Sequence, residues 1–241
     1  MKKIINFSGG RTSAYMTIKE YKEGDLVIFC DTGREHDKTY KFINDFEANE
    51  NIPIIRLKYK DSENPFAALL KHNNYSNIPN RVKRFCTIEL KIKTARRYLR
   101  SEGIMNYENL IGFRYDEPLR MKRRKKTWKG VTDRFPLYDK KINKSQINEY
   151  WSKKSYNLEI PSILGNCTLC FMKGKNAIIS ILASYPKLAD EWIKDEQMNK
   201  KGFTYFNGIT MQQLKELSQN NLFKDYDLNE IKPAFDCACT S

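Results

Sequence analysis

A glycine-rich segment near the start of the chain has the residue types of an anion-binding loop. Ser8-Gly9-Gly10-Arg11-Thr12-Ser13 lies between the apolar stretch Ile4 to Phe7 and a segment predicted to be helical to about Tyr21. Glycines let the backbone approach a ligand, hydroxyls add hydrogen-bond donors, and a helix N-terminus carries partial positive charge. A phosphate chain is the anion that suits such a loop. It is not the GxxxxGKS/T loop, because no lysine follows the glycines.

Cysteines form a second group of residues that could do chemistry. Cys167-x-x-Cys170 has the spacing of metal ligands, Cys86 offers a third thiolate, and Cys237 or Cys239 could supply a fourth. Because the chain has only two histidines, an all-cysteine set favours an iron–sulfur cluster or a four-thiolate zinc site. A redox disulfide or a pair of buried thiols is the alternative for the CxxC pair.

Charged residues near predicted strands and helices could contact an anionic ligand. Asp31 follows a predicted strand and could bind magnesium or a ribose hydroxyl, or cap the next helix. Lys91, Arg114 and Arg120 have the character to hold phosphate or sulfate oxygens, which arginine does in a bidentate manner. Glu117 could orient the two arginines or simply pair with them.

Length and composition limit the class of protein. The chain has 241 residues, of which 40% are hydrophobic and 30% charged. This length suits one large domain or a domain with a subdomain, and the composition is globular, not disordered. No apolar run is long enough to span a membrane, and the stretch Met1 to Phe7 is too short for a signal-peptide core. We therefore expect a soluble, cytoplasmic protein with no membrane partner.

Two short segments carry the whole net charge of +14. Arg81 to Arg100 contains eight basic residues and one acidic residue, and Arg120 to Lys129 contains seven basic residues and no acidic one. Solvated helix or loop faces are one explanation of such runs. An anionic ligand is another, whether nucleotide, sulfate, RNA or DNA, and Trp128 could stack on a base. For the second segment, a mobile lid over the nucleotide is a third.

Alternating strand and helix patterns predict the fold. Strands are expected at Ile4–Phe7, Leu26–Cys30, Pro53–Leu57 and Leu110–Phe113. Helices are expected between them, including Cys86–Arg100 with the apolar stripe Ile88, Ile92, Ala95 and Leu99. This alternation implies an α/β fold with a parallel sheet flanked by helices, whose ligands bind at the carboxyl ends of the strands.

The pattern changes after about Phe135, where mainly helices are predicted. Their ranges are Ser145–Trp151, Lys175–Tyr185, Ala189–Met198 and Met211–Ser218. We therefore divide the chain into a nucleotide-binding α/β core, residues 1–135, and a mainly helical C-terminal section, residues 136–241. The second section carries the CxxC pair and a cysteine-containing tail.

Five spaced motifs together resemble one known superfamily. They are Ser8–Ser13, Asp31-Thr32-Gly33-Arg34-Glu35, Arg84-Phe85-Cys86-Thr87 with Leu90-Lys91, Gly112-Phe113-Arg114-Tyr115-Asp116-Glu117 with Arg120, and Asn166-Cys167-Thr168-Leu169-Cys170-Phe171 with the Cys-containing tail. The first is similar to the SGGxxS loop of the PP-loop ATP pyrophosphatases, or adenine nucleotide alpha hydrolases. The set resembles the phosphoadenosine-phosphosulfate reductase branch of that superfamily.

The resemblance implies a Rossmann-like, HUP-type fold and an adenine nucleotide whose phosphates lie over the first loop. The implied nucleotide-binding residues are Ser8, Gly9, Gly10, Arg11, Thr12, Ser13, Asp31, Thr32, Gly33, Gly112, Arg114, Glu117 and Arg120. The implied catalytic residues are Lys91, Arg114 and Cys239. A 4Fe–4S cluster is preferred over Zn²⁺, with ligands Cys86, Cys167, Cys170 and Cys237.

Two departures from the reductase pattern leave the reaction open. Cys86 stands alone where those reductases carry adjacent cysteines, and the tail reads Asp236-Cys237-Ala238-Cys239-Thr240-Ser241 in place of a Glu-Cys-Gly motif. Our leading hypothesis is cleavage of ATP with Mg²⁺ at the α-phosphate, which activates an acceptor such as nucleic acid for sulfur transfer. The sulfur would be delivered through the metal centre or a tail cysteine, and a sulfur donor protein could be a further partner.

Two other functions remain as alternatives. The first is a sulfonucleotide reductase in which Cys237 or Cys239 attacks the sulfur of an adenylyl sulfate. The second is a non-catalytic regulator that binds nucleotide or nucleic acid. A homodimer is compatible with any of the three.

Overall fold

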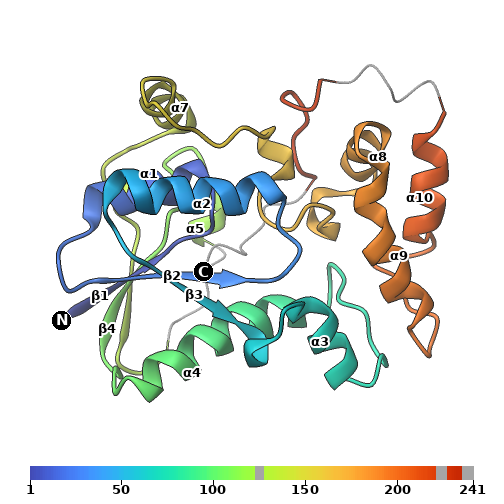
Figure 1. Ribbon diagram of the computed structural model, residues 1–241, viewed down its shortest axis with the longest axis horizontal. Helices are drawn as coiled ribbons and strands as arrows, with labels where there is room; N and C mark the ends of the chain where they lie inside the picture. Colours follow the sequence, from blue (N-terminus) through green and yellow to red (C-terminus); the bar gives the residue numbers. More distant parts are fainter. Residues whose placement is uncertain (123–127, 221–226, 235–241) are drawn as a thin grey trace.

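Five parallel strands form a single sheet in the order β3-β2-β1-β4-β5 (Figure 1). The computed structural model describes residues 1–122, 128–220 and 227–234. The strands are β1 (Lys2–Asn6), β2 (Leu26–Asp31), β3 (Ile54–Lys58), β4 (Tyr107–Leu110) and β5 (Val131–Arg134). The order runs outward from β1 in both directions, so the switch point lies between β1 and β4. Ligands of open parallel sheets bind at the carboxyl ends of the strands beside such a point.

Apolar residues alternate along the inner strands, and this alternation explains how both faces of the sheet are covered. Ile4 and Ile28 pack with Leu99 on one face, whereas Ile5 and Phe29 belong to the larger core on the other. The α-helices that lie between β1 and β4 in the chain are α1 (Arg11–Glu20), α2 (Asp37–Glu50), α3 (Pro65–His72) and α4 (Thr94–Ser101). In Figure 1, α1 and α2 lie on one side of the sheet and α4 lies on the other. The predicted α/β fold with a parallel sheet is confirmed.

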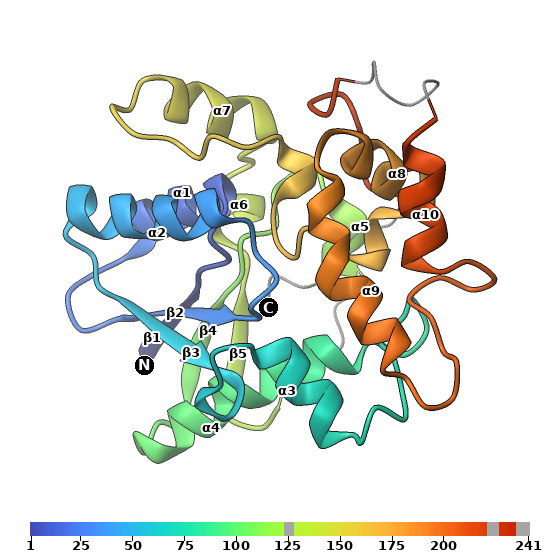
Figure 2. The same ribbon diagram turned by 45° about the vertical axis from the view of Figure 1, so that its right-hand side comes forward.

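The described chain after β5 contains helices and no further strand of the sheet. The α-helices after β5 are α6 (Pro136–Asp139), α7 (Lys144–Ser152), α8 (Lys175–Ser184), α9 (Asp190–Gln197) and α10 (Met211–Ser218). Helix α5 (Pro118–Lys122) lies between β4 and β5. Short 3-10 turns lie at Tyr59–Asp61, Ser162–Leu164, Phe171–Lys173 and Pro186–Ala189. Figure 2 shows α8, α9 and α10 grouped beside the sheet. The division of the chain at residue 135 stays a prediction.

The fourth strand differs from its predicted position. It covers Tyr107–Leu110 and not Leu110–Phe113, because the chain turns at Phe113, whose amide donates to the carbonyl of Ile111 at 2.9 Å. The sequence did not predict β5, Val131–Arg134, because this strand lies at the sheet edge and carries charged and polar residues. Helix α3 was also not predicted.

A π-helix, η2 (Thr87–Lys93), opens the predicted helix Cys86–Arg100. Its wider turn rotates the buried face away from the expected stripe, so that Ile88 is 47% exposed and Leu90 is buried. The prediction of Ile88 as a core residue is therefore wrong, since the pattern assumed 3.6 residues per turn throughout. Leu99 on α4 is buried as expected.

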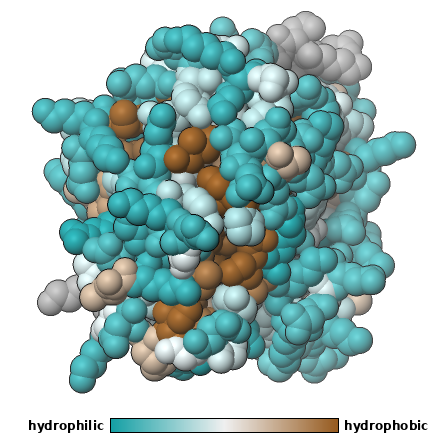
Figure 3. Space-filling model, turned by 60° about the vertical axis from the view of Figure 1, so that its left-hand side comes forward, coloured by the Kyte–Doolittle hydropathy of each residue, from teal (hydrophilic) through white to brown (hydrophobic). Residues whose placement is uncertain are grey.

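The face of the molecule in Figure 3 is largely hydrophilic. Figure 3 shows one face on which hydrophilic side chains surround a band of hydrophobic ones. Within the described residues, no helix is long and apolar enough to cross a membrane.

Candidate nucleotide site

The loop between β1 and α1 is closed by its own serines. Ser13 Oγ accepts a hydrogen bond from the Ser8 amide at 3.0 Å, and it lies 3.0 Å from both Ser8 Oγ and the carbonyl oxygen of Gly10. Gly10 occupies the N-cap position of α1 and has no side chain that could accept from the first-turn amides. The loop therefore presents amides and hydroxyls at the positive end of a ten-residue helix.

Gly9 is required by the shape of this loop. Its φ angle is +73°, and a Cβ atom there would lie 2.7 Å from Thr39 Cγ2 and 3.3 Å from Ile43 Cδ1. Both contacts come from α2, which packs against the loop from behind. A residue with a side chain would therefore displace the loop or the helix.

A cavity of about 630 Å³ lies in front of the loop, at the carboxyl end of β1. We call it the nucleotide cavity, after the ligand predicted for its loop. Nine residues of the predicted nucleotide set line it: Ser8, Gly10, Arg11, Thr12, Ser13, Gly112, Arg114, Glu117 and Arg120. The structure thus brings together the first loop and the segment after β4, which are about one hundred residues apart in sequence. Gly9 supports the loop from behind, and the other predicted members lie elsewhere.

Glu117 connects the two predicted phosphate-binding arginines. Its Oε1 lies 2.6 Å from Arg120 Nη1 and 3.3 Å from Arg114 Nη2. Arg114 Nε also lies 2.9 Å from Asp116 Oδ1, and the Arg120 guanidinium lies 4.7 Å from the Phe113 ring centroid. Because the side chains of Arg114 and Arg120 are only 16% and 11% exposed, these contacts hold both at the cavity wall.

Arg11 joins the loop to the segment after α7. Its Nε donates to Asn157 Oδ1 at 2.8 Å and its Nη2 donates to the carbonyl of Leu158. Trp151 Nε1 donates to the Arg11 carbonyl at 2.9 Å. Burial lowers the pKa of Arg11 from its ordinary value. Arg11 thus fixes one wall of the cavity as well as lining it.

Three polar side chains connect the strands near the switch point. Asn6 Nδ2 donates to Asn109 Oδ1 at 2.7 Å and to the carbonyl of Leu110 at 2.8 Å. Asn109 Nδ2 in turn donates to Asp133 Oδ1 at 2.7 Å. Asn6 lines the cavity and was not predicted as a site residue. The sequence signal for Asn6 is a polar amide within the otherwise apolar stretch Ile4 to Phe7.

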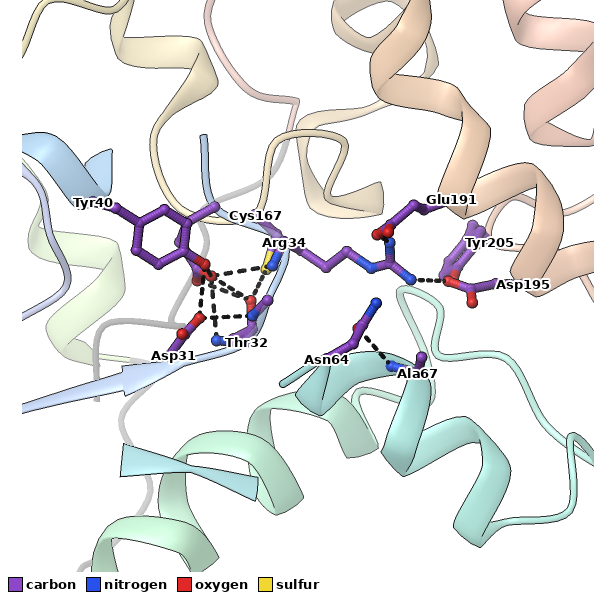
Figure 4. Close-up of polar contacts among 12 residues, drawn as sticks. Asp31, Thr32, Arg34, Tyr40, Asn64, Ala67, Cys167, Glu191, Asp195 and Tyr205 are labelled. Carbon is purple, nitrogen blue, oxygen red and sulfur yellow. Dashed lines mark hydrogen bonds and ion pairs between the residues drawn. The ribbon is translucent and has the colours of Figure 1, made fainter. Parts of the chain in front are cut away.

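Asp31 and its neighbours occupy a separate, buried polar cluster (Figure 4). Asp31 Oδ1 accepts from the Gly33 amide and from the Tyr40 hydroxyl, each at 2.8 Å. Lys58 Nζ lies 3.9 Å from Asp31 Oδ2. The carboxylate therefore already has protein donors, and Asp31, Thr32 and Gly33 do not line the nucleotide cavity.

The same cluster holds a buried glutamate and one of the predicted metal ligands. Thr32 Oγ1 donates to Glu35 Oε1 at 2.8 Å, and the Cys167 thiol lies 3.3 Å from Thr32 Oγ1. Burial raises the pKa of the Glu35 carboxyl, and the Lys91 ammonium opposes that shift. Lys91 was predicted to be catalytic but does not line the nucleotide cavity.

Cys30 lies in β2 and is not a candidate ligand. Burial raises the pKa of its thiol to about 12, so this thiol stays protonated.

The predicted metal centre does not assemble from the described cysteines. Across residues 1–122, 128–220 and 227–234, no three His, Cys, Asp or Glu side chains gather so that they could hold a metal ion. The four-cysteine centre therefore stays a prediction from the sequence. Cys237, Cys239 and most of the basic run after Arg120 lie outside the described residues.

The sulfur residues are nevertheless close to the nucleotide cavity. Cys170 lines a smaller cavity of about 240 Å³ that shares Gly165, Asn166 and Lys232 with the larger one. Asn166 has a φ angle of +56°, and its Oδ1 is buried without a hydrogen-bond partner among the described residues. Asn166, Lys144 and Lys232 all line the nucleotide cavity and were missed as site residues. Asn166 adjoins the CxxC pair, whereas nothing in the local sequence singles out the two lysines.

Comparisons with known proteins support the resemblance. The family model for the phosphoadenosine phosphosulfate reductase domain matches residues 2–158. The phage lambda "Uncharacterized nin region protein ORF290" is 31% identical over 207 residues, which cover 74% of this chain and 68% of that protein.

Two archaeal relatives are longer. "Uncharacterized protein MJ0973" and "Uncharacterized protein MJ0066" of Methanocaldococcus jannaschii are 23% and 25% identical, over 89% and 78% of this chain. The chain spans only 54% and 40% of their lengths.

Among solved structures, a phosphoadenylyl-sulfate reductase from Candida auris in a phosphate complex matches with a TM-score of 0.42 and 16% identity. That match covers 63% of this chain and 71% of the other. The family model covers more than half of the chain, and the lambda relative exceeds 30% identity over two thirds of its own length. The chain therefore belongs to the phosphoadenosine phosphosulfate reductase domain family.

Proposed function

We propose that the chain binds ATP with its phosphates over Ser8–Ser13 and cleaves it to AMP and pyrophosphate while activating an acceptor. The observation that carries this proposal is the 630 Å³ cavity, in which the glycine-serine loop and the N-terminus of α1 face two arginines and two lysines. This arrangement suits a chain of phosphates better than a single small anion. Family membership supports an adenine nucleotide as the ligand.

The proposed reaction is a displacement at the α-phosphorus. An acceptor oxygen forms the new P–O bond, the bond to the bridging oxygen breaks, and pyrophosphate leaves with the electron pair. Loop amides, Arg114 and Arg120 would stabilise the charge that develops on the phosphates. Lys144 and Lys232 line the same cavity and would add positive charge. Mg²⁺ bound by the phosphates would supply further charge neutralisation.

We propose nucleic acid as the acceptor and sulfur transfer as the second step. Both basic runs support this proposal, because Arg120 lines the cavity and Cys86 lies within the other run. A nucleophilic sulfur from a donor protein would form a bond to the acceptor carbon that carries the adenylated oxygen. The bond between this carbon and that oxygen breaks, and AMP leaves with the oxygen. If the donor is a persulfide, the acceptor is first joined to it through an S–S bond. A second thiol must then attack the donor's sulfur, which releases the acceptor thiolate and leaves a disulfide that an external dithiol reductant must reduce.

Release of pyrophosphate from ATP by the anaerobically purified protein tests the proposal. We expect the variant Ser8→Ala/Gly10→Ala to lose about tenfold or more in rate, because a donor to a charged phosphate is worth about 1.5–3 kcal/mol. Ser101→Ala is the matched control, since Ser101 Oγ donates only to the Tyr98 carbonyl at the end of α4. Equal rates for the wild type and the loop variant would contradict the proposed phosphate site.

A sulfonucleotide reductase is the second candidate, and the family to which the chain belongs supports it. Sulfite released from an adenylyl sulfate, with no pyrophosphate from ATP, would select the reductase and exclude the leading proposal. Nucleotide binding without either activity would identify a regulator.

The cysteine-ligated cluster stays a prediction from the sequence, and no step above depends on it. If Cys86, Cys167, Cys170 and Cys237 hold a 4Fe–4S cluster, anaerobically purified protein should contain iron and acid-labile sulfide, and Cys170→Ser should lose both. Cys30→Ser is the control, because that thiol lies in β2. Stoichiometric zinc without iron would contradict the cluster and support the alternative metal site.

A further inference from the structure

A second cavity, of about 1280 Å³, lies outside the nucleotide site. Its walls are the turn at Asn80, the start of α8, and the loop between α9 and α10. Figure 2 shows α8, α9 and α10 grouped together. Arg81, Lys83, Lys175 and Lys232 line it, whereas none of its described lining residues is an aspartate or a glutamate. We call this cavity the basic groove. An anionic ligand would meet no carboxylate on its described walls.

The first wall of the basic groove is a hydrogen-bonded turn. Asn80 Oδ1 accepts from the amides of Val82 and Lys83 at 3.0 and 2.9 Å. This turn places Arg81 and Lys83 at the surface, where both are exposed. Their positions are therefore set by the backbone and not by chance orientations of a loose chain.

The opposite wall is fixed by one buried asparagine. Asn199 Oδ1 accepts from the amides of Lys201 and Phe203 at 3.1 and 2.8 Å, and its Nδ2 donates to the Tyr75 carbonyl at 2.9 Å. These bonds connect the loop after α9 to the segment that leads into the Asn80 turn. The hydrogen bond from Asn199 to Tyr75 thus connects the segments that form the two walls.

The floor of the basic groove supplies aromatic and amide groups. Phe203, which is 45% exposed, lines the groove together with the buried Phe171 and Tyr205, whose stacked ring centroids lie 6.5 Å apart. Asn176 offers an exposed amide that can contact base edges, whereas the Gln213 amide oxygen already accepts from the Thr210 amide at 2.9 Å. Helix α8 begins here, so the positive end of its dipole adds to the cationic side chains.

We propose that the basic groove binds a single strand of nucleic acid. Phosphates would contact Arg81, Lys83 and Lys175, and one base would stack on Phe203. Base faces are available for stacking only when a strand is unpaired, which favours a single strand over a duplex. An acidic peptide would satisfy the lysines but would leave the aromatic ring and the Asn176 amide without matching groups.

The basic groove also adjoins the nucleotide site. Lys232 lines both cavities, and Pro233 beside it lines the nucleotide cavity. A strand held in the groove would therefore extend toward the phosphates of a bound nucleotide. Its role as acceptor rests on the proposed function, whereas its binding does not, so the two can be tested separately.

Fluorescence anisotropy with a labelled oligo-U or oligo-dT of about 12 nucleotides, without ATP, tests the groove. We expect Lys83→Gln/Lys175→Gln to weaken binding and to lower the slope of log K against log salt by about 1–2. Phe203→Ala should weaken binding about fivefold or more and leave that slope unchanged. The matched control is Lys2→Gln/Lys22→Gln, which removes two exposed charges near the amino ends of β1 and β2.

Three results would overturn the proposal. The first is equal binding by the wild type and the groove variants, and the second is equal weakening by the control pair. The third is equally tight binding of a labelled hexaglutamate peptide, which would identify a surface for acidic proteins. If any of these occurs while pyrophosphate release persists, the groove proposal fails and the nucleotide proposal stands.

Discussion

The variant Arg34→Met should lower the free energy of unfolding by about 3–5 kcal/mol at neutral pH, because it leaves a buried carboxylate without its partner. The Arg34 side chain is 3% exposed, and its Nη2 lies 2.7 Å from Asp195 Oδ2 on α9. Its guanidinium also pairs with Glu191 (Figure 4), and it lies 5.1 Å from the Phe66 ring centroid. Urea unfolding followed by circular dichroism measures the loss.

The pH dependence of this loss follows from Asp195. Burial raises the pKa of Asp195, and Arg34 opposes that shift. Without Arg34 the folded-state pKa rises further, so the folded variant prefers the protonated carboxyl. A carboxyl with a raised folded-state pKa costs stability as pH rises through its unfolded-state value, about 3.9. The destabilisation by Arg34→Met should therefore be smaller at about pH 4 than at pH 7.

A double variant separates charge from packing. Arg34→Met/Asp195→Asn removes both buried charges and should recover a large part of the stability, because no uncompensated carboxylate remains. Lys153→Met is the control, since Lys153 and Glu149 form an exposed pair whose removal should have little effect. No recovery in the double variant would show that the guanidinium acts through its packing on Phe66 and Trp192.

The variant Gly9→Ala should cost about 2–4 kcal/mol of folding stability, from left-handed backbone strain and overpacking together. The added Cβ would lie 2.7 Å from Thr39 Cγ2, so α2 or the loop must move. Because the same loop is proposed to hold phosphates, pyrophosphate release should fall as well. Unfolding and activity measurements on one preparation test both effects.

Gly24→Ala is the matched control for this variant. Gly24 has a φ angle of +90°, but an added Cβ would have no atom within 4 Å. It should therefore show only the backbone cost, about 1 kcal/mol, with no change in pyrophosphate release. Equal destabilisation by the two substitutions would contradict the argument that the loop is packed tightly against α2.

Much of the fold could be predicted from local patterns. Short apolar runs marked β1 and β2, because inner strands of a parallel sheet are buried on both faces. The edge strand β3 was also predicted, because Ile54, Ile55 and Leu57 are apolar. The other edge strand, Val131–Arg134, was not predicted, because most of its side chains are polar or charged. The π-helix was not predicted, because seven residues with i→i+5 hydrogen bonds are too few to produce a recognisable periodicity of apolar residues.

The candidate site was predictable only where a motif and its backbone lie together. Ser8–Ser13 was identified because glycines, hydroxyls and a following helix are adjacent in sequence. Asp31 was predicted to contact the nucleotide, but the structure places it against Tyr40 and Gly33, outside the cavity. Neighbours in sequence could not show that these two donors would occupy the carboxylate.

The sequence by itself determined the parallel α/β fold and the family, and it predicted the phosphate-type loop, because these depend on residue order within short segments. Only the tertiary structure decided that Arg114, Arg120, Lys144 and Lys232 face that loop, and that Asn166 joins them. It also decided that Arg81, Lys83 and Lys175 line a different cavity. The physical reason is that these groups come from segments distant in sequence, and their meeting depends on how helices and loops pack against the sheet.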